Sequence, residues 1–425
     1  MERLPGFRDF YPEPLPHSDV WSADARQLIF SKWREMARRY GFREYDGPPL
    51  ETLELFTTKS GQEIVGQLYN FTDKGGRNVS LRPEMTPTLA RMVAAHERNY
   101  KKPIKWFAVP QLFRYERQQK GRLREHFQFN ADVIGETDPA ADAELVALLI
   151  DTLRSFGLTA EDFVIRLSSR NAWHDFYERG RGPAASKQDE AGASSDEYEF
   201  FQIIDKLERT EPDESEKKLA ALGFSLAEVN KFIESGEPTA ELKSILDNLA
   251  ARGMSDFVKV DYHVIRGLAY YTGVVFEAFD RKGEFRAIAG GGRYDNLIKL
   301  LSNGKVNLPA LGFGMGDVVL FELLKARKLL PKFDANVDVF VLVEDEGLRP
   351  QSLQLVQELR TAGFAVEYSL VPAKPDKQFK RAQELKAAFT AKLENDAYAR
   401  IRNLKTRTEL VAGAGDVKNH LAQSQ

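Results

Sequence analysis

The clearest pattern along the chain is an unbroken alternation of apolar and polar residues at 126–133, HFQFNADV. The apolar positions of this segment are Phe127, Phe129, Ala131 and Val133. A period of two residues is that of a strand, whose successive side chains point to opposite faces. The segment is therefore predicted to be a strand with its apolar face in a core.

A second alternating segment, 112–117, precedes it and is joined to it by the loop 118–124. We therefore predict an antiparallel hairpin over 112–135. Its polar floor would carry Arg114, Glu116, Gln128 and Asp132. The loop carries Lys120, Arg122 and Arg124, which could close over phosphates from a rigid support.

The alternative for the hairpin is a solvated polar face with a solvated basic turn. The position of the basic loop at the end of a polar-floored hairpin favours a functional site.

Helical periodicity follows the hairpin. A helix is predicted from about 139 to 156, with Asp138 as its cap, Pro139 in its first position and Gly157 as its stop. The small and polar stretch 180–197 is expected to be a loop. Heavily charged helical patterns then fill about 198–252.

Strand patterns return at 257–279 and 285–289, and a break falls near Pro331. Beyond the break, strands are predicted at 337–343, at 365–370 and around 399–404, with one helix ending at Gly363 and another over 377–389. This alternation predicts a small α/β domain with a largely parallel sheet.

Composition narrows the class of protein. The chain has 425 residues, of which 43% are hydrophobic and 29% charged, as in globular proteins of two or three domains. No apolar run approaches the roughly 18–20 residues that cross a bilayer, so no membrane partner is expected. The first residues lack an apolar signal core, and there is no cysteine, so a cytoplasmic location is expected.

Charge and histidine content limit the candidate chemistry. The net charge of −3 implies that any nucleic acid is contacted through local patches. The six histidines form no His-x-x-x-His pair, so no protein metal site is expected. Gly290–Gly292 is followed by no Lys-Ser/Thr, which excludes a P-loop and leaves a close backbone approach to a ligand or a tight bend.

The hairpin resembles motif 2 of class II aminoacyl-tRNA synthetases, in which Phe-Arg-x-Glu precedes a basic loop and an acid-ended strand. Here the pattern is Phe113-Arg114-Tyr115-Glu116, followed by Gly121-Arg122-Leu123-Arg124. Within this class the chain is most similar to the histidyl-tRNA synthetases. The further blocks that carry the resemblance are Gly6–Phe10, Pro48–Glu51 with Leu55-Phe56 (motif 1), Leu81–Thr86, Arg266–Tyr271 and Gly291–Asp295.

The resemblance covers nearly the whole chain and implies an α+β fold: a class II antiparallel sheet flanked by helices, a helical insertion and a C-terminal α/β anticodon-binding-like domain. The domains expected are the catalytic core at 1–171 and 256–330, the insertion at 172–255 and the C-terminal domain at 336–425. The resemblance also implies a homodimer built through motif 1.

The implied reaction is activation of histidine by ATP, followed by transfer of histidine to tRNA(His). The attacking carboxylate is already ionised at pH 7, so the reaction needs positioning and cations rather than a general base. The resemblance assigns catalysis to Arg266 and Arg114, with Mg2+ bridging the ATP phosphates. It assigns histidine binding to Glu84, Thr86, Gln128, Asp132, Tyr270, Tyr271 and Tyr294. It assigns ATP binding to Arg114, Glu116, Arg122 and His126, and contact with the tRNA acceptor end to Gln119 and Lys120.

The chain departs from the family pattern at four positions. Asp132 stands where the family has glutamate, His126 where it usually has phenylalanine and Ala269 where it has aspartate. In motif 3 a glycine-rich turn, Gly312–Gly316, leads into a helix that has Val319 in place of an arginine. One cationic contact to ATP is therefore unaccounted for.

These departures keep a second interpretation open. A non-charging paralogue, such as the regulatory subunit of ATP phosphoribosyltransferase, would bind histidine without activating it. The basic motif 2 loop and the segment 336–425 argue against that paralogue. A plain RNA-binding module would have no need of the block 266–271, although Arg266 could instead pair with an acid such as Asp261.

The C-terminal domain is expected to read the anticodon with cationic side chains, because single-stranded bases bind to cations and stacking surfaces. The candidates are Lys377, Lys380, Arg381, Arg400, Arg402, Lys405 and Arg407. For any one of them, a solvated helix or strand face is an equally good interpretation.

Overall fold

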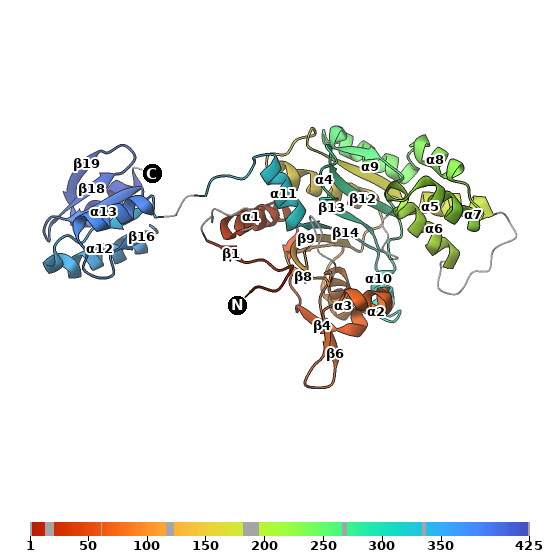
Figure 1. Ribbon diagram of the computed structural model, residues 1–425, viewed down its shortest axis with the longest axis horizontal. Helices are drawn as coiled ribbons and strands as arrows, with labels where there is room; N and C mark the ends of the chain where they lie inside the picture. The colour runs from red at the N-terminus through yellow and green to blue at the C-terminus, as the bar shows by residue number, and fades with distance from the viewer. Residues whose placement is uncertain are drawn as a thin grey trace. The chain divides into compact units, whose positions relative to one another are not determined.

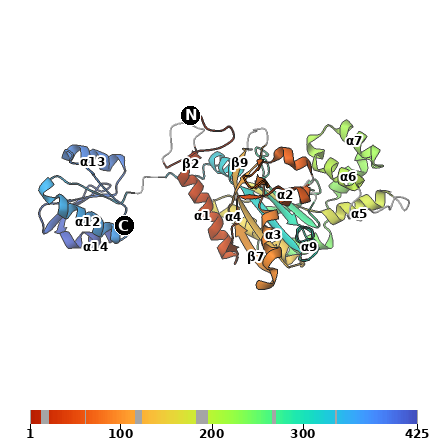
Figure 2. The same cartoon turned by 90° about the horizontal axis from the view of Figure 1, so that it is seen from below.

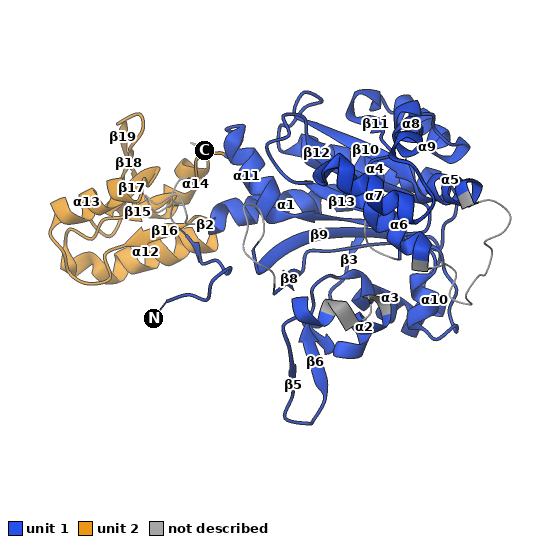
Figure 3. Cartoon of the chain, turned by 45° about the vertical axis from the view of Figure 1, so that its right-hand side comes forward, with its two compact units in different colours: residues 1–330 blue, residues 331–425 orange. Residues whose placement is uncertain are grey.

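The computed structural model describes residues 2–12, 21–60, 62–115, 123–181, 195–265, 270–333 and 337–423. These residues fall into two compact units, Met1–Leu330 and Pro331–Gln425 (Figure 3). The division coincides with the sequence break predicted near Pro331.

The first unit is built on a nine-stranded sheet (Figure 1). Across the sheet the strands are β11 (Val258–Val260), β10 (Phe163–Ser169), β12 (Val274–Asp280), β13 (Ala289–Arg293), β14 (Ala310–Gly316), β9 (Glu125–Ile134), β7 (Ile104–Ala108) and β3 (Arg43–Glu44), with β8 (Gln111–Phe113) paired to β9 beside this path. Neighbouring strands are antiparallel except for β3–β7 and β10–β11 at the two edges. The antiparallel sheet predicted for the core is confirmed.

The predicted hairpin is present as β8 and β9, with Leu112 opposite His126. Its first strand is shorter than the predicted 112–117: β8 ends at Phe113, and 116–117 lie outside the described residues. The alternation along β9 separates its two faces as expected. Phe129, Ala131 and Val133 are buried in the main hydrophobic core, where Phe129 stacks on Trp33 at 5.8 Å between ring centroids. The polar residues of β9 lie on the opposite face.

Helices cover both faces of this sheet, but unequally (Figures 2 and 3). On the apolar face of β9, α1 (Ala23–Arg39) and α4 (Ala140–Ser155) contribute buried side chains to the main hydrophobic core. On the other face, α3 (Thr86–His96) and α10 (Leu297–Leu301) pack against Ile134, at one end of β9 only. The polar residues of β9 are therefore left uncovered by this pair of helices.

The capping signals around α4 act as predicted. The Asp138 carboxylate accepts a hydrogen bond from the backbone N–H of Ala140 at 2.8 Å, which satisfies one N-terminal donor of the helix. Gly157 follows the last turn with φ of +90°, a conformation that favours glycine. The predicted helix 139–156 thus agrees with Ala140–Ser155 to within one residue at each end.

Helices occupy the charged stretch at about 198–252, as the pattern predicts, and one further helix lies directly after β10. They are α5 (Arg170–Arg181), α6 (Ser195–Asp205), α7 (Pro212–Ala221), α8 (Leu226–Ser235) and α9 (Ala240–Ala251). Most of the predicted loop 180–197, namely 182–194, lies outside the described residues, and its two ends are helical instead, since α5 ends at Arg181 and α6 begins at Ser195.

The strands predicted after these helices needed correction. The segment 257–279 contains two separate strands, β11 and β12, and the prediction for 285–289 is wrong except at Ala289. The actual strand, β13, is the glycine-rich run Ala289–Arg293. Glycine disfavours isolated strands, so the sequence pattern pointed to the more apolar residues before it.

Smaller elements complete the first unit. They are the parallel pair β1 (Phe10–Tyr11) and β2 (Trp21–Ser22), the sheet of β4 (Leu50–Thr52), β6 (Asn78–Leu81) and β5 (Asn70–Thr72), and the helices α2 (Leu53–Ser60) and α11 (Asp317–Ala326).

The second unit has a five-stranded sheet in the order β16 (Val366–Tyr368), β15 (Val339–Val341), β17 (Phe389–Leu393), β18 (Tyr398–Asn403) and β19 (Glu409–Gly413). Its helices are α12 (Arg349–Thr361), α13 (Pro375–Glu384) and α14 (Val417–Ala422). The α/β class is as predicted, but the sheet is mixed: β15 pairs in parallel with β16 and β17, whereas β18 pairs antiparallel with β17 and β19.

The helix predicted over 377–389 is too long. α13 ends at Glu384, and Lys386 has a positive φ of 52°. Phe389 then begins β17, where it pairs with Val339 on one side and Asn403 on the other. Tertiary pairing overrides the helical propensity of the run KAAF.

Within the described residues, no helix is long and apolar enough to cross a membrane.

A buried ion pair fastens β13 to the start of α4. The Arg293 Nε donates to Asp142 Oδ2 at 3.0 Å, and both side chains are almost fully buried. The same guanidinium donates to the carbonyls of Glu136 and Asp138 at 3.0 Å each. Burial nevertheless raises the pKa of Asp142 to about 7, against the opposing effect of Arg293.

We predict that Arg293→Ala lowers the free energy of unfolding by about 3–5 kcal/mol, because it leaves the Asp142 carboxyl buried without its partner. A matched control is Arg34→Ala, which removes an ion pair to Glu44 in which both side chains are 44% exposed. That change should cost less than about 1 kcal/mol. Urea unfolding measures both, and equal losses would contradict the importance assigned to the buried pair.

Candidate functional site

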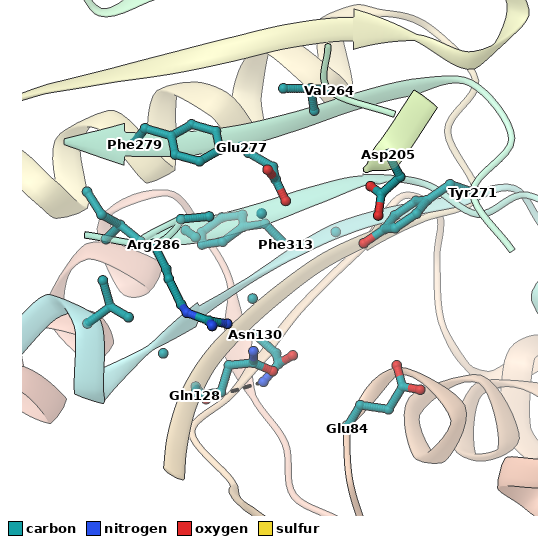
Figure 4. Close-up of a pocket in the computed structure, with 18 of the residues that line it drawn as sticks. Glu84, Gln128, Asn130, Asp205, Val264, Tyr271, Glu277, Phe279, Arg286 and Phe313 are labelled. Atoms are coloured by element: carbon teal, nitrogen blue, oxygen red, sulfur yellow. Dashed lines mark hydrogen bonds between the residues drawn. The ribbon is translucent and has the colours of Figure 1, made fainter. Parts of the chain in front are cut away.

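A pocket of about 920 Å3 opens over the polar face of β9. Every predicted ligand-binding residue that the structure describes lines it: Glu84, Thr86, Arg114, His126, Gln128, Asp132, Tyr270, Tyr271 and Tyr294. Residues remote in sequence are thus brought to one wall, and Figure 4 shows several of them pointing into a common space. The predicted residues Glu116, Gln119, Lys120, Arg122 and Arg266 lie outside the described part of the chain.

The floor of the pocket is formed by β9, β14, β13 and β12. In the two middle strands, β14 and β13, the residues in line with Asp132 are glycines. Asp132 on β9 lies opposite Gly312 on β14, and Gly312 lies opposite Gly292 on β13. One step along, Asn130 lies opposite Gly314 in the same way. The floor between β9 and β12 is therefore bare backbone.

These glycines are required by close approach. A Cβ placed on Gly312 would lie 1.9 Å from Oδ1 of Asp132, and one on Gly314 would lie 2.7 Å from Cδ of Gln128. The side chains of β9 lean across the neighbouring strand into space that only glycine leaves open. Gly291, on the opposite face, is fixed by packing instead, because its Cβ would lie 2.2 Å from the carbonyl oxygen of Gly312.

The predicted motif 3 turn is a strand. Gly312–Gly316 belongs to β14, which runs directly into α11 at Asp317. Glycine-rich sequence suggested a turn, but here it reflects the crowding by β9. Gly290–Gly292 is likewise a strand rather than a tight bend, and here the close neighbours of Gly291 and Gly292 are β14, β12 and Tyr271.

Asp132 is the most deeply buried acid on this floor, with 4% of its surface exposed. The hydroxyl of Tyr294 donates to its Oδ1 at 2.6 Å. Burial raises the pKa of Asp132 to about 7, although the bond from Tyr294 acts in the opposite direction. The carboxyl is therefore poised to exchange a proton near neutrality.

Tyr45 adds a second hydroxyl beside this acid. Its oxygen is buried and has no hydrogen-bond partner among the described residues. Burial, together with the charge of Asp132, raises the pKa of Tyr45 well above its usual value. Sequence analysis did not single out Tyr45, because it precedes motif 1 and belongs to none of the matched blocks.

The opposite end of the pocket is cationic. The Arg114 Nε donates to the carbonyl of Pro83 at 3.1 Å, which fixes the side chain beside His126. Burial lowers the pKa of His126 to about 3, and the charges of Arg114 and Arg8 add to the effect. The imidazole is thus neutral at pH 7 and offers a flat face rather than a charge.

A buried cluster beneath this end joins three distant segments. The Arg8 guanidinium donates to Glu125 at 2.7 Å and to Asp317 at 2.8 Å, and all three side chains are at most 3% exposed. Asp317 also accepts from the backbone N–H of Phe127 at 2.9 Å. The N-terminal segment therefore holds the start of α11 against β9.

Several pocket residues were missed by sequence analysis: Asn130 as a ligand candidate, Asp205, Glu208, Arg209, His263, Glu277 and Arg286. Glu277 had a signal, since it is the one charged residue within the apolar run VVFEAF of β12. No sequence signal marked Asp205, Glu208 or Arg209, because charged residues are common along the helical stretch that contains them.

Asp261, considered as an alternative partner for Arg266, is occupied by other residues. It accepts from Lys259 at 3.1 Å and lies 2.9 Å from Nδ1 of His263. Although burial acts to raise the pKa of Asp261, the bonds from His263 and Lys259 hold it well below its usual range. The carboxylate is thus already neutralised within the described residues.

Comparisons with known proteins agree with this arrangement. The sequence profile for histidyl-tRNA synthetase matches residues 17–316, and that for the anticodon binding domain matches 336–419. The histidine–tRNA ligase of Opitutus terrae is 47% identical over 96% of this chain and 95% of its own length.

Two solved structures share the fold. The histidyl-tRNA synthetase from Nostoc sp. PCC 7120 has a TM-score of 0.75 at 20% identity and covers 97% of this chain and 98% of that one. An ATP phosphoribosyltransferase regulatory subunit/histidyl-tRNA synthetase from Bacillus halodurans has a TM-score of 0.68 at 21% identity, over 89% and 96% of the two chains. The profile match over most of the chain, and the identity to the Opitutus ligase, decide the family: this chain belongs to the histidyl-tRNA synthetases.

Proposed function

We propose that this chain is a histidine–tRNA ligase, which activates histidine with ATP and transfers it to the 3′-terminal adenosine of tRNA(His). One observation carries the proposal: a single pocket joins a buried acid–tyrosine pair, Asp132 and Tyr294, to a cationic end at Arg114. The first feature suits an imidazole N–H, and the second suits a phosphate.

In the activation step an oxygen of the histidine carboxylate attacks the α-phosphorus, and the bond to pyrophosphate breaks. Arg114 would neutralise the charge that grows on the α-phosphoryl oxygens, together with Arg266 as the resemblance assigns it. Glu84, Thr86 and Gln128 would hold the ammonium group. Glu84 is positioned in part by the Tyr270 hydroxyl, which donates to its Oε2 at 3.4 Å.

At the other end of the amino acid, Tyr271 and Tyr294 would wall the imidazole ring, whose N–H donates to Asp132. The neutral ring of His126 suits stacking on adenine, with Glu116 and Arg122 as further ATP contacts by resemblance. In the second step the terminal hydroxyl of the tRNA attacks the carbonyl carbon, and AMP leaves.

Mg2+ bound together with ATP would supply further positive charge against the phosphates, beside that of Arg114. In the described part of the chain no group of three or more acidic or histidine residues could hold a metal ion.

The non-charging paralogue is the second candidate function. The fold is compatible with it, because the Bacillus halodurans protein, whose name includes the regulatory subunit, has the same fold. The match to an anticodon binding domain at 336–419 favours the ligase, because a protein that only senses histidine does not need a domain that binds the anticodon of a tRNA. In the C-terminal unit, Arg400 and Arg402 already pair with Glu409 at 3.4 Å each. Lys377, Lys380, Arg381, Lys405 and Arg407 are exposed and are the better candidates for RNA contact, with Gln119 and Lys120 proposed for the acceptor end.

We further propose the domains 1–171, 172–255, 256–330 and 336–425, and a cytoplasmic location, where ATP, histidine and tRNA meet. The insertion boundaries are supported by the run of helices from α5 to α9, which begins at Arg170 and ends at Ala251.

The deciding experiment is amino-acid-dependent ATP–pyrophosphate exchange with each amino acid in turn. We expect exchange with histidine alone. Arg266→Ala should abolish it while histidine binding stays detectable, because the arginine is assigned to the phosphate. Histidine binding without exchange in the wild-type protein would instead identify the paralogue, and unchanged exchange in the variant would refute the role of Arg266.

Asp132→Asn should separate function from stability. We expect KM for histidine to rise at least about tenfold, because a charge-assisted hydrogen bond is lost. The raised pKa of Asp132 means that its contribution to stability is present below about pH 4 and is lost as pH rises through about 7. The variant should therefore be more stable than the wild type at pH 8, by up to about 4 kcal/mol, and equal to it near pH 3.

Urea unfolding of both proteins across pH 3–8 tests the stability difference, and pyrophosphate exchange at pH values where the wild type is active tests the change in KM for histidine. The matched control is Asp138→Asn, at an exposed cap that asparagine fills equally well. An Asp132→Asn variant that is less stable than the wild type at pH 8 would contradict the buried, poised carboxyl.

A homodimer is proposed through motif 1. Leu50 on β4 and Phe71 on β5 are large apolar side chains exposed by 39% and 52% in the single chain, which suits an interface in this segment. We expect sedimentation at micromolar concentration to give twice the mass of the chain. A monomer under those conditions would refute the proposal.

A further inference from the structure

The ATP end of the pocket has an unusual wall at the start of α11. Val318 and Val319 line the pocket there, beside Gly316. The resemblance places an arginine at position 319, so this helix does not supply the expected cation. A bound triphosphate carries several negative charges, and some group must balance them.

The strand register brings another segment to this place. Ala289, the first residue of β13, lies opposite Met315, and β14 gives way to α11 directly after Gly316. The residues that enter β13 must therefore pass beside the first turn of α11. Phe285, Arg286 and Ala287 accordingly line the same pocket as Val318 and Val319.

Arg286 points into the pocket from this segment. Figure 4 shows its guanidinium extending from the side of Phe313 toward Gln128 and Asn130 on β9. Gln128 lies opposite Gly316 in the sheet, so this is the end of the floor where α11 begins. Arg286 is exposed, so a ligand that enters the pocket can reach it.

The charges around the pocket make this cation significant. The lining contains the acids Glu84, Asp132, Asp205, Glu208 and Glu277 and, among its described residues, the arginines Arg114, Arg209 and Arg286. Arg209 is the last residue of η3 (Leu207–Arg209), which follows α6 on the wall formed by the helical stretch. At the α11 end, His126 is neutral, so Arg114 and Arg286 are the cations that the described wall offers.

We propose that Arg286 binds the outer phosphates of ATP and takes the place of the arginine that position 319 lacks. The assignment rests on the proposed ligase function. Arg114 would hold the reacting α-phosphate and Arg286 the departing pyrophosphate. A planar guanidinium suits this task, because it can donate two parallel hydrogen bonds to phosphate oxygens.

The test is pyrophosphate exchange with purified full-length variants. For Arg286→Ala we expect KM for ATP to rise about 10- to 100-fold, the usual effect of losing a hydrogen bond to a charged group. KM for histidine should stay within about twofold. Arg286→Lys should recover part of the loss, because it keeps the charge without the fork.

Lys282→Ala is the matched control, since Lys282 is exposed in the same connection between β12 and β13. It should leave both KM values unchanged. Unchanged KM for ATP in Arg286→Ala would overturn the assignment, as would an equal rise in KM for histidine. Absence of exchange in the wild-type protein would instead overturn the ligase function, and direct titration of ATP onto the same variants would still test Arg286.

Discussion

The site depends on glycines in β13 and β14, two strands of the pocket floor. Gly292 on β13 and Gly312 and Gly314 on β14 leave the middle of the floor without side chains, so the polar residues of β9 can lean across it. A flat amino-acid or nucleotide substrate could then rest on peptide groups while β9 supplies the specific contacts. Any side chain at Gly312 would occupy the place of the Asp132 carboxylate, so the glycine and the acid form a single device.

Burial raises the pKa of Asp132 and also lowers the stability of the fold when this carboxyl is ionised. An acid held near neutral pKa destabilises the fold wherever it is ionised, and the enzyme must recover that free energy elsewhere. The Arg293–Asp142 pair and the Arg8 cluster carry the same cost, because burial raises the pKa of Asp142 and of Asp317 although a guanidinium lies beside each carboxyl. In return, each guanidinium joins segments that are distant in the sequence. Buried ion pairs, as well as apolar packing, therefore hold the segments around the polar site together.

Much of this could be predicted from the chain alone. The alternation at 126–133 and the capping signals around α4 are local patterns, and they identified the hairpin and the helix closely. The pocket-lining positions of Glu84, Tyr271 and Tyr294 followed from matched motifs rather than from any pattern of their own.

What escaped prediction depends on long-range pairing. β17 begins inside an apparent helix because Phe389 pairs with two other strands, and β14 looked like a turn because crowding by β9 demands glycine. Arg286 lies before a strand whose register could not be inferred from sequence. No local sequence pattern distinguishes Arg286 from other cationic residues in loops. Its place in the pocket follows only from the position of β13 beside α11.

The bond from Arg8 to Asp317 spans 309 residues of chain, and this has a consequence for synthesis on the ribosome. At about 5–20 residues per second, the N-terminal segment waits some 15–60 s, on the order of a minute at most, before its partner is made. During that interval Arg8 and Glu125 can pair, but β9 has no β14 beside it and the start of α11 does not yet exist. The segment around Arg8 is therefore synthesised early but is among the last to be fixed in place, and the nascent chain cannot hold a finished site until the first unit is almost complete.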